Sequence, residues 1–391
     1  MVNTKHDAAS YESCSYKRDI SDGNVLYAGF WKAQQNVNWK AQVQRFEMNL
    51  LTELASLQHD LRNQQYTFSP ETHFLMRTRG RVRPITSEHI RDRVSKHALC
   101  DEVLAPAVAK MLIHDNGASR VGKGISFTRA RLLAHLQRYY LKHGNDGYIL
   151  LMDFTKYYDN LLHSIIYEMF EPLVDDPIAW YLFKLCISRS TLDVSYMTDE
   201  EYACCLDTLF NYVDYQLKDQ ALFTGEKYME KHLNIGDQVA QIVGITYPTR
   251  FDTYIKIVRS VKGYSRYMDD SYAIDQSKMF LEDLLGGAIE QAATLGITLN
   301  RKKTRIVKLS DYWRFLQIQY SLTETGRVVK KINPERLTVM RRRMKLVYKK
   351  MTPLAFTNWY NSWYQNHYRL MSKKQRENMN TLFNELLEEI K

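Results

Sequence analysis

The stretch GYSRYMDDSYAI (residues 263–274) holds two adjacent carboxylates, Asp269 and Asp270, between two runs that are typical of β-strands. This pattern predicts a hairpin with both carboxylates at its tip. Like charges held this close repel, and burying a carboxylate costs free energy unless a cation neutralises it. The stretch therefore predicts a cation-binding site.

A third carboxylate, Asp153, ends the apolar run YILLMD (residues 148–153), which predicts a buried strand. If this strand lies beside the hairpin in one sheet, three carboxylates converge at one edge. Oxygen ligands suit Mg²⁺, with Mn²⁺ as a substitute. Two such ions about 4 Å apart hold the attacking and leaving oxygens of a phosphoryl displacement. The three carboxylates therefore predict nucleotidyl transfer assisted by two Mg²⁺ ions.

The charge of the chain favours a polyanion as partner. Its 391 residues carry a net charge of +10, and residues 331–391 contain 13 Lys and Arg against 5 Asp and Glu. A basic region at one end of a chain suggests contact with nucleic acid. The alternative is a solvated helical face.

The cysteines and the termini predict a cytoplasmic protein without a membrane segment. There are five cysteines and no CxxC pair, which argues against a disulfide framework or a zinc site. Residues 1–23 are polar, unlike a secretory signal, and no run approaches the roughly 18 apolar residues of a membrane span.

The periodicity of the chain predicts an α+β core of short antiparallel strands, followed by a basic helical domain. The expected elements are a helix over 39–63, a hairpin over 73–85, a helical region over 175–232, two short strands within 297–309 and a hairpin over 313–329.

Over residues 46–350 the chain resembles the bacterial reverse transcriptases. MDFTKYYDNL (residues 152–161) resembles the first catalytic motif of that family, and YMDD (residues 267–270) is its hallmark second motif. Three further segments follow the same order: the fingers region RVRPI with RDRVSKHAL, the lysine-bearing LGITLNRKKTRI, and the primer-grip hairpin WRFLQIQYSLTETG.

The resemblance implies an RNA-directed DNA polymerase with a right-hand fold, whose partners are an RNA template and a DNA product. The implied domains are an N-terminal arm (1–35), fingers with the start of the palm (36–145), a palm with a helical insertion near 175–232 (146–330) and a basic helical thumb (331–391). No ribonuclease H domain is expected.

Roles in catalysis also follow from the resemblance. Asp153, Asp269 and Asp270, with the carbonyl of Phe154, match the family's metal ligands. Lys303 matches the lysine that protonates the leaving pyrophosphate, although Lys302 is an equally basic neighbour.

Other residues match positions that contact the incoming nucleotide. Arg83 matches the fingers arginine that folds over the triphosphate, and Arg77 or Arg79 is a candidate for a second cation. Tyr158 matches the aromatic residue whose ring excludes a 2′-hydroxyl, which implies a deoxynucleotide substrate.

The segment NIGDQVAQ (residues 234–241) departs from the usual family pattern. Most reverse transcriptases carry Gln-Gly where this chain has Ile235 and Gly236. Together with Gln241, this pattern resembles error-prone enzymes of diversity-generating retroelements and reverse transcriptases of antiphage defence. We expect relaxed fidelity, and a close approach of the Gly236 backbone to the base pair.

The segment RRRMKLVYKK opens the last domain and is expected to contact nucleic acid. The residues that we expect to make this contact are Arg341, Arg342, Arg343, Lys345 and Lys349. The aromatic residues that follow it, from Trp359 to Tyr364, are expected to form the domain's own core.

The biological setting stays open among three alternatives. We favour antiphage defence with a dedicated non-coding RNA as template, because residues 195–220 add material between the catalytic motifs. A diversity-generating retroelement is the second setting, and a retron or group II intron is the third. An inactive RNA-binding scaffold and an RNA-copying RNA polymerase are alternatives in function. A protein partner or a homo-oligomer is compatible with the sequence.

Overall fold

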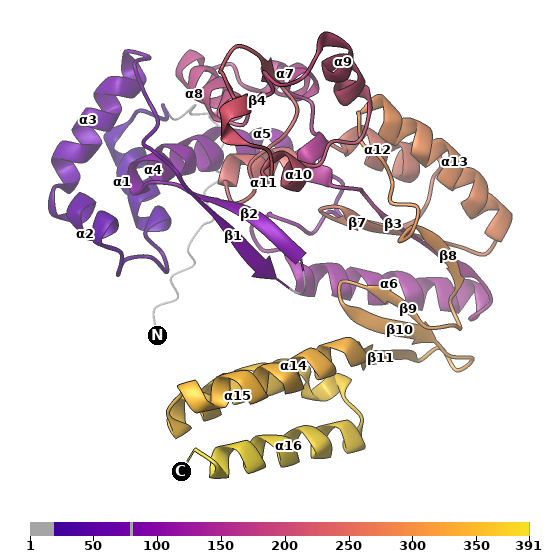
Figure 1. Ribbon diagram of the computed structural model, residues 1–391. Helices are drawn as coiled ribbons and strands as arrows, with labels where there is room; N and C mark the ends of the chain where they lie inside the picture. Colours follow the sequence, from indigo (N-terminus) through magenta and orange to yellow (C-terminus); the bar gives the residue numbers. More distant parts are fainter. Residues whose placement is uncertain (1–18, 79–80, 391) are drawn as a thin grey trace, which may run out of the picture. The chain divides into compact units, whose positions relative to one another are not determined.

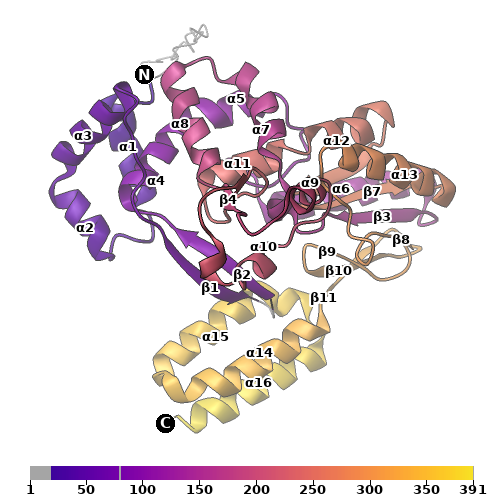
Figure 2. The same ribbon diagram turned by 45° about the horizontal axis from the view of Figure 1, so that its top comes forward.

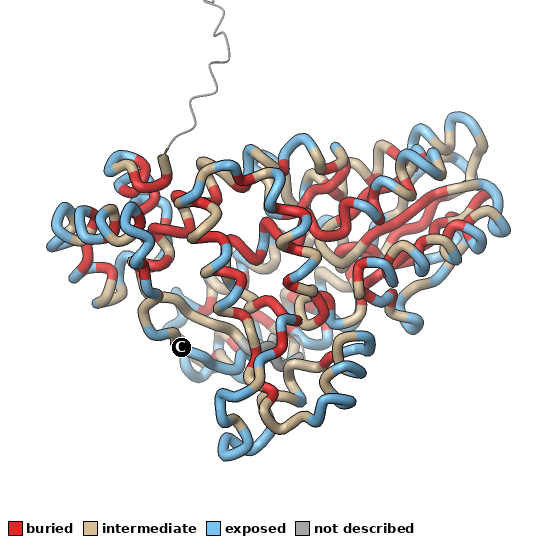
Figure 3. Tube along the Cα trace, turned by 90° about the horizontal axis from the view of Figure 1, so that it is seen from above, coloured by how far each residue is buried: buried red, intermediate tan, exposed pale blue. Residues whose placement is uncertain are grey.

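The computed structural model describes residues 19–78 and 81–390, which form two compact units. Unit 1 contains the described residues up to Leu112 together with Tyr158–Tyr247, and unit 2 contains Ile113–Tyr157 together with the residues from Pro248 onward. Each unit mixes helices with short antiparallel strands, so the predicted α+β class is confirmed (Figure 1). Buried residues line the interior of each unit (Figure 3).

Unit 2 is built around a four-stranded antiparallel sheet with the order β6-β7-β3-β8. Its strands are β3 (Tyr148–Asp153), β6 (Gly263–Tyr267), β7 (Asp270–Asp275) and β8 (Arg305–Lys308). The apolar strand β3 lies beside the hairpin strand β7, as the three-carboxylate prediction requires. Ile149 to Met152 are all buried, because the sheet is covered on both faces.

One face of this sheet packs against α6 and a second, three-stranded sheet. Alternate residues of β3 and β7, such as Ile149 and Tyr272, share a core with Leu136 of α6 and Trp313 of β9. The covering elements are α6 (Ile125–His143), β9 (Trp313–Phe315), β10 (Ile318–Leu322) and β11 (Val328–Ile332). Helix α13 (Lys278–Thr294) also contacts β3 and β7.

The C-terminal part of unit 2 is a bundle of three helices (Figures 1 and 2). The helices are α14 (Pro334–Val347), α15 (Pro353–His367) and α16 (Lys373–Glu388), with short 3₁₀ turns at Tyr348–Lys350 and Tyr368–Leu370. Asn333 and Thr352 cap the first two helices, and a proline follows each cap. Tyr360 is buried in the bundle core, and Trp359, Trp363 and Tyr364 pack against that core, which confirms the core interpretation of these aromatic residues.

The remaining elements of unit 2 are short. They are α12 (Thr249–Thr253) and a π-helical turn, η5 (Tyr254–Val258), which precede β6.

Unit 1 is mostly helical. Its principal helices are α1 (Gly23–Ala33), α2 (Ala41–Met48), α3 (Leu50–Arg62), α4 (Ile90–Leu99), α5 (Ala105–Ala109), α7 (His163–Phe170), α8 (Pro177–Ser188), α9 (Asp199–Asp207), α10 (Tyr212–Tyr215) and α11 (Gln238–Thr246). A π-helical turn, η1 (Cys100–Leu104), joins α4 to α5, and 3₁₀ turns lie at Tyr157–Asn160, Glu171–Leu173 and Gln220–Leu222. Its strands form a hairpin, β1 (Thr72–Thr78) with β2 (Arg81–Ser87), and a separate antiparallel pair, β4 (Leu192–Asp193) with β5 (Tyr228–Met229).

Four segments differ from the prediction. The helix expected over 39–63 is divided at Asn49, whose φ of −113° and ψ of 25° are not helical. The region 175–232 is not wholly helical, because β4 and β5 pair within it. Residues 297–309 hold one strand and an isolated bridge at Leu299, and residues 313–332 hold three strands rather than a hairpin.

Helix α1 belongs to the packed part of unit 1. Its residues Val25, Leu26 and Phe30 are buried, and Asp22 caps its first turn. The segment expected to be an N-terminal arm (1–35) therefore contains a helix of the core. Within the described residues, the helices are too short or too polar to cross a bilayer.

A fully buried ion pair holds the β6–β7 hairpin. Arg266 of β6 donates two bonds to one oxygen and one to the other oxygen of Asp252 of α12, at 2.6–3.0 Å. Its third nitrogen, Nη1, donates to the carbonyl of Met268 in the hairpin turn at 3.1 Å. Tyr264 donates to Asp252 at 2.6 Å. Burial alone would lower the pKa of Arg266, but the Asp252 charge raises it above its usual value, so the pair stays ionised.

Removing Asp252 would leave the Arg266 charge buried without its partner. We expect Asp252→Ala to lower the free energy of unfolding by roughly 3–5 kcal/mol, measured by urea denaturation. Glu282→Ala, which breaks the exposed Lys278–Glu282 pair of α13, should leave this free energy almost unchanged. Equal effects of the two variants would contradict the structural role given to Asp252.

Candidate active site

Strand pairing brings two of the three predicted carboxylates together. Asp153, the last residue of β3, lies directly opposite Asp270, the first residue of β7. Asp153 is buried, and Asp270 is half-buried. A shift of β3 by one residue would turn Asp153 to the other face of the sheet from Asp270 and separate the two carboxylates.

The hairpin turn positions Asp269 next to this pair. The turn contains only Met268 and Asp269, and Met268 has a φ of 54°, in a region where glycine is usual. The Asp269 carbonyl accepts from the backbone N–H of Phe154 at 3.3 Å. The backbone that follows Asp153 is thereby tied to the turn that carries Asp269.

Lys303 lies against the Asp153 carboxylate. Its Nζ is 2.6 Å from both Asp153 oxygens. Asn300 positions the lysine, because its N–H donates to the Asp153 carbonyl at 2.7 Å and its side chain accepts from the N–H of Lys302 and of Lys303. Of the two lysines that sequence reasoning left open, Lys303 is the one whose ammonium contacts Asp153.

Burial and neighbouring like charges raise the pKa of one carboxyl group of this site. Burial, followed by the charges of Asp269 and Asp153, raises the pKa of Asp270 to about 7. Lys303 acts to lower this pKa, but burial and the two neighbouring carboxylates outweigh its effect. The donor set consists of carboxylate oxygens and a nearby carbonyl, which suits Mg²⁺ or Mn²⁺. In the parts of the chain that the structure describes, no three His, Cys, Asp or Glu side chains are already grouped as metal ligands, and it is the Lys303 ammonium that contacts Asp153.

Unit 1 contains the residues that we expect to contact a nucleotide. Gly236 and Gln241 line a cavity of about 410 Å³ next to β2 and α4. Gly236 has a φ of 119°, and a Cβ at this position would lie 3.2 Å from the Thr86 carbonyl of β2. Ile235 is half-buried beside it. Glycine is thus favoured at position 236 for two reasons, the positive φ of its backbone and the close approach of the Thr86 carbonyl.

Tyr158 packs on helix α11. A Cβ built on Gly244 would lie 2.5 Å from the Tyr158 hydroxyl oxygen, so the absence of a side chain at Gly244 makes room for the ring. The Tyr158 carbonyl accepts from the N–H of Leu233 at 2.9 Å. The packing expected for a core tyrosine and a gating role are both compatible with this position.

Arg77 and Arg83 belong to the β1–β2 hairpin. Their backbones pair with Val82 and Met76, respectively. Their side chains lie outside the described residues, as does all of Arg79.

A buried lysine that sequence reasoning missed organises the cavity of unit 1. Lys96 of α4 contacts Glu88 and lies 2.6 Å from Asp237, the residue after Gly236. Asp237 in turn caps α11 by accepting from the N–H of Val239 at 2.8 Å. Burial and then the Asp237 charge raise the pKa of Glu88 to about 7. No sequence signal distinguishes Lys96 from an exposed helical lysine.

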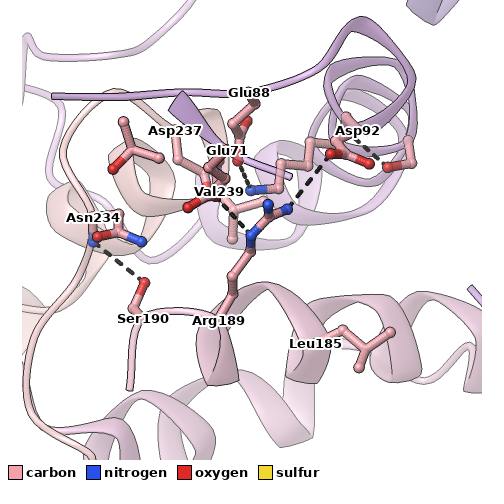
Figure 4. A network of polar contacts seen from close by, with 12 residues as sticks. Glu71, Glu88, Asp92, Leu185, Arg189, Ser190, Asn234, Asp237 and Val239 are labelled. Atoms are coloured by element: carbon pink, nitrogen blue, oxygen red, sulfur yellow. Dashed lines mark hydrogen bonds and ion pairs between the residues drawn. The ribbon is translucent and has the colours of Figure 1, made fainter. Parts of the chain in front are cut away.

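The same network continues through Arg189 (Figure 4). Its Nε lies 2.7 Å from Glu71, and its Nη1 lies 3.5 Å from Asp92. Tyr66 donates to Asp92 at 2.5 Å. The segments on either side of the β1–β2 hairpin are therefore joined to α8 and α11 by buried charges.

The basic residues predicted to bind nucleic acid lie on α14 and the turn that follows it. Arg342, Lys345 and Lys349 are exposed, and Arg341 is half-exposed. The exposed Arg343 lies over the ring of Trp359 at 5.6 Å from the centroid. None of the five forms an ion pair with a carboxylate of the described residues. Their charge is available to an anion.

No protein-family model matches the chain, and no curated protein matches it in sequence.

The conformation of Gly236 gives a direct test of the unit 1 cavity. Gly236→Ala should lower the free energy of unfolding by about 1–3 kcal/mol, because alanine is strained at this φ and meets Thr86. Gly286→Ala is the matched control. It lies inside helix α13 with no atom within 4 Å of the new Cβ, so it should raise stability by about 0.5–1 kcal/mol. Urea denaturation distinguishes the two, and stabilisation by Gly236→Ala would refute the assigned backbone constraint.

Proposed function

We propose that the chain is an RNA-directed DNA polymerase that adds deoxynucleotides to a primer. The observation that supports this proposal best is the pairing of Asp153 with Asp270, with Lys303 held against Asp153. A scaffold has no need for buried carboxylates, which cost free energy. The motif order carries the rest of the proposal, including a right-hand arrangement of fingers (36–145), palm (146–330) and thumb (331–391).

The proposal gives each residue of the site a role. Asp153, Asp269 and Asp270, with the Phe154 carbonyl, would hold Mg²⁺, which when bound neutralises phosphate charge and lowers the pKa of the primer 3′-hydroxyl. Lys303 holds a proton at Nζ, and this proton can pass to the pyrophosphate as it leaves. Asn300 keeps that ammonium within reach of the site through its bonds to the loop backbone.

Substrate selection is assigned to unit 1. Arg83, and Arg77 as a second cation, are proposed to contact the triphosphate. Tyr158 is proposed to exclude the 2′-hydroxyl. Ile235 cannot donate the hydrogen bond that a glutamine side chain would supply, which is the basis for relaxed fidelity. The template that we favour is a dedicated non-coding RNA in antiphage defence, with a diversity-generating retroelement as the alternative.

The central test is primer extension on an RNA template with deoxynucleotides and Mg²⁺. Asp270→Asn should reduce the rate to below about a thousandth of that of the unaltered chain, and a chelator should abolish extension. Asp311→Asn, which removes an exposed carboxylate of the same unit, is the control and should extend normally. Failure of the unaltered chain to extend any primer, with RNA binding intact, would favour the scaffold.

The proposed gate makes a separate prediction. Tyr158→Ala should raise the incorporation of ribonucleotides relative to deoxynucleotides by roughly 10- to 100-fold, because the ring no longer clashes with the 2′-hydroxyl. Tyr158→Phe keeps the ring and should discriminate as the unaltered chain does. Competition between the two nucleotide types in single-turnover extension measures this ratio. An unchanged ratio in Tyr158→Ala would leave Tyr158 a packing residue only.

A further inference from the structure

Unit 2 contains a cavity of about 470 Å³ that lies away from Asp153, Asp269 and Asp270. Its lining includes Gly263, the first residue of β6, and Asp275, the last residue of β7. Asp270 begins β7, so the two sites lie at opposite ends of that strand, about 17 Å apart along it. The cavity therefore belongs to a different place from the candidate active site, and we refer to it as the basic pocket.

Positive side chains dominate the basic pocket. Arg138 and Lys142 of α6 and Lys262 of the loop before β6 are exposed there, and none forms an ion pair with a carboxylate of the described residues. Beside the pocket, burial and then the charges of Arg131 and Arg138 hold the pKa of Lys256 below its usual value, in spite of Asp115. An anion bound among Arg138, Lys142 and Lys262 would reduce the repulsion between these three cations.

A fourth cation in the pocket is held in place. Arg259 donates to the Tyr254 hydroxyl at 3.0 Å and to Asp283 at 2.5 Å, and its guanidinium lies 5.2 Å from the Phe280 ring centroid. A guanidinium fixed in this way loses little conformational entropy when it binds a phosphate. The acidic residue in the lining, Asp275, already accepts from the N–H of Ser277 at 2.9 Å.

Aromatic rings line the same pocket. Tyr139 and His143, one turn apart on α6, have ring centroids 5.0 Å apart. Burial and the nearby charges of Asp275 and Asp146 raise the pKa of Tyr139 to about 12, so its hydroxyl stays protonated and donates to the Asp146 carbonyl. Basic groups interleaved with aromatic rings suit the backbone and bases of a single strand.

We propose that the basic pocket binds a single-stranded nucleic acid segment outside the catalytic site, through phosphates at Arg138, Lys142, Arg259 and Lys262 and through stacking near Tyr139. A polymer is favoured over a small anion because the free cations come from two separate elements and are exposed to solvent rather than converging on one point. This contact goes beyond the proposed polymerase activity, since it needs no chemistry. It provides an anchor for a strand that extends past the copied segment.

The test measures binding in a chain that cannot polymerise, with Asp269→Asn and Asp270→Asn as background. The pocket variant adds Arg138→Glu, Lys142→Glu and Lys262→Glu. The control variant adds Lys110→Glu, Lys184→Glu and Lys218→Glu, three exposed lysines of unit 1, so the total charge is the same. The probes are a labelled 30-nucleotide single-stranded RNA and a DNA of matching sequence, titrated at several salt concentrations.

The pocket variant should bind the probes at least about tenfold more weakly than the control variant, with a salt slope shallower by about 2. A loss for RNA alone identifies RNA as the ligand, and an equal loss for both strands identifies the shared phosphate backbone. Equal affinities of the pocket and control variants for both strands would overturn the proposal. So would a pocket variant that loses only its affinity for inorganic pyrophosphate, which would mark a small-anion site.

Two further measurements distinguish a loss of binding in the pocket from misfolding of the variant and from a loss of polymerase activity. A milder variant, with glutamine at the three pocket positions, should show a smaller loss in the same direction, and it replaces the glutamate variant if that variant does not fold. With the carboxylates restored, the pocket variant should extend a short pre-annealed primer at the unaltered rate. An unaltered chain without any extension activity would end the polymerase proposal and leave the binding result standing.

Discussion

The buried guanidinium of Arg266 is the interaction on which the geometry of unit 2 depends. It joins Asp252 of α12 to the hairpin turn through the Met268 carbonyl. The backbone of the same residue bonds to the loop at Asp115 and Gly117. The loop at residues 115–117, helix α12 and the hairpin turn therefore meet at one residue, the first through its backbone and the other two through its side chain. Such a pair adds little stability relative to apolar packing, but its loss is expensive because either partner alone is a buried charge.

The structure brings the carboxylates of Asp153, Asp269 and Asp270 close together, and Lys303 offsets part of their repulsion. Lys303 supplies one positive charge to Asp153, while burial and then the charges of Asp269 and Asp153 raise the pKa of Asp270. A divalent cation would complete the balance, and it would compete with Lys303 for the Asp153 oxygens. Release of that ammonium from Asp153 is what would free its proton for transfer. The Lys303 side chain therefore has two proposed positions: one in the salt bridge with Asp153, and one, released from Asp153, in which it acts as the acid.

Sequence patterns predicted the elements whose periodicity is unambiguous. The apolar run at β3 and the hairpin of β6 and β7 were recognisable, because one is a continuous apolar run and the other is two runs typical of strands on either side of a turn. Asn49 was not recognised as a helix break, since the apolar spacing continues through α2 and α3. A two-residue strand such as β4 carries too few residues for a pattern.

The residues of the candidate site that belong to recognisable sequence motifs could be predicted, and the others could not. The sequence indicated Asp153, Asp270 and Lys303, and it gave no sign of Lys96 or of the basic pocket. Lys96 is one of several basic residues in helix α4, and only the fold shows that it is buried between Glu88 and Asp237. The pocket is assembled from α6 and a loop more than a hundred residues later, so no linear window contains it.

In each unit, a turn with a positive φ is tied to a buried cation. Each unit has a turn with a positive φ at a position that the proposed function uses: Met268, with a φ of 54° that strains a residue other than glycine, and Gly236, with a φ of 119° that glycine adopts without strain. Each turn is tied to a buried cation, Arg266 at Met268 and Lys96 at the neighbouring Asp237. A strained turn costs about 1–3 kcal/mol, whereas breaking a buried ion pair costs roughly 3–5 kcal/mol. At Met268 the cost of breaking the Arg266–Asp252 pair exceeds the strain of the turn. At Gly236 the pairing of Lys96 with Asp237 and Glu88 fixes the residue next to a turn that glycine adopts without strain.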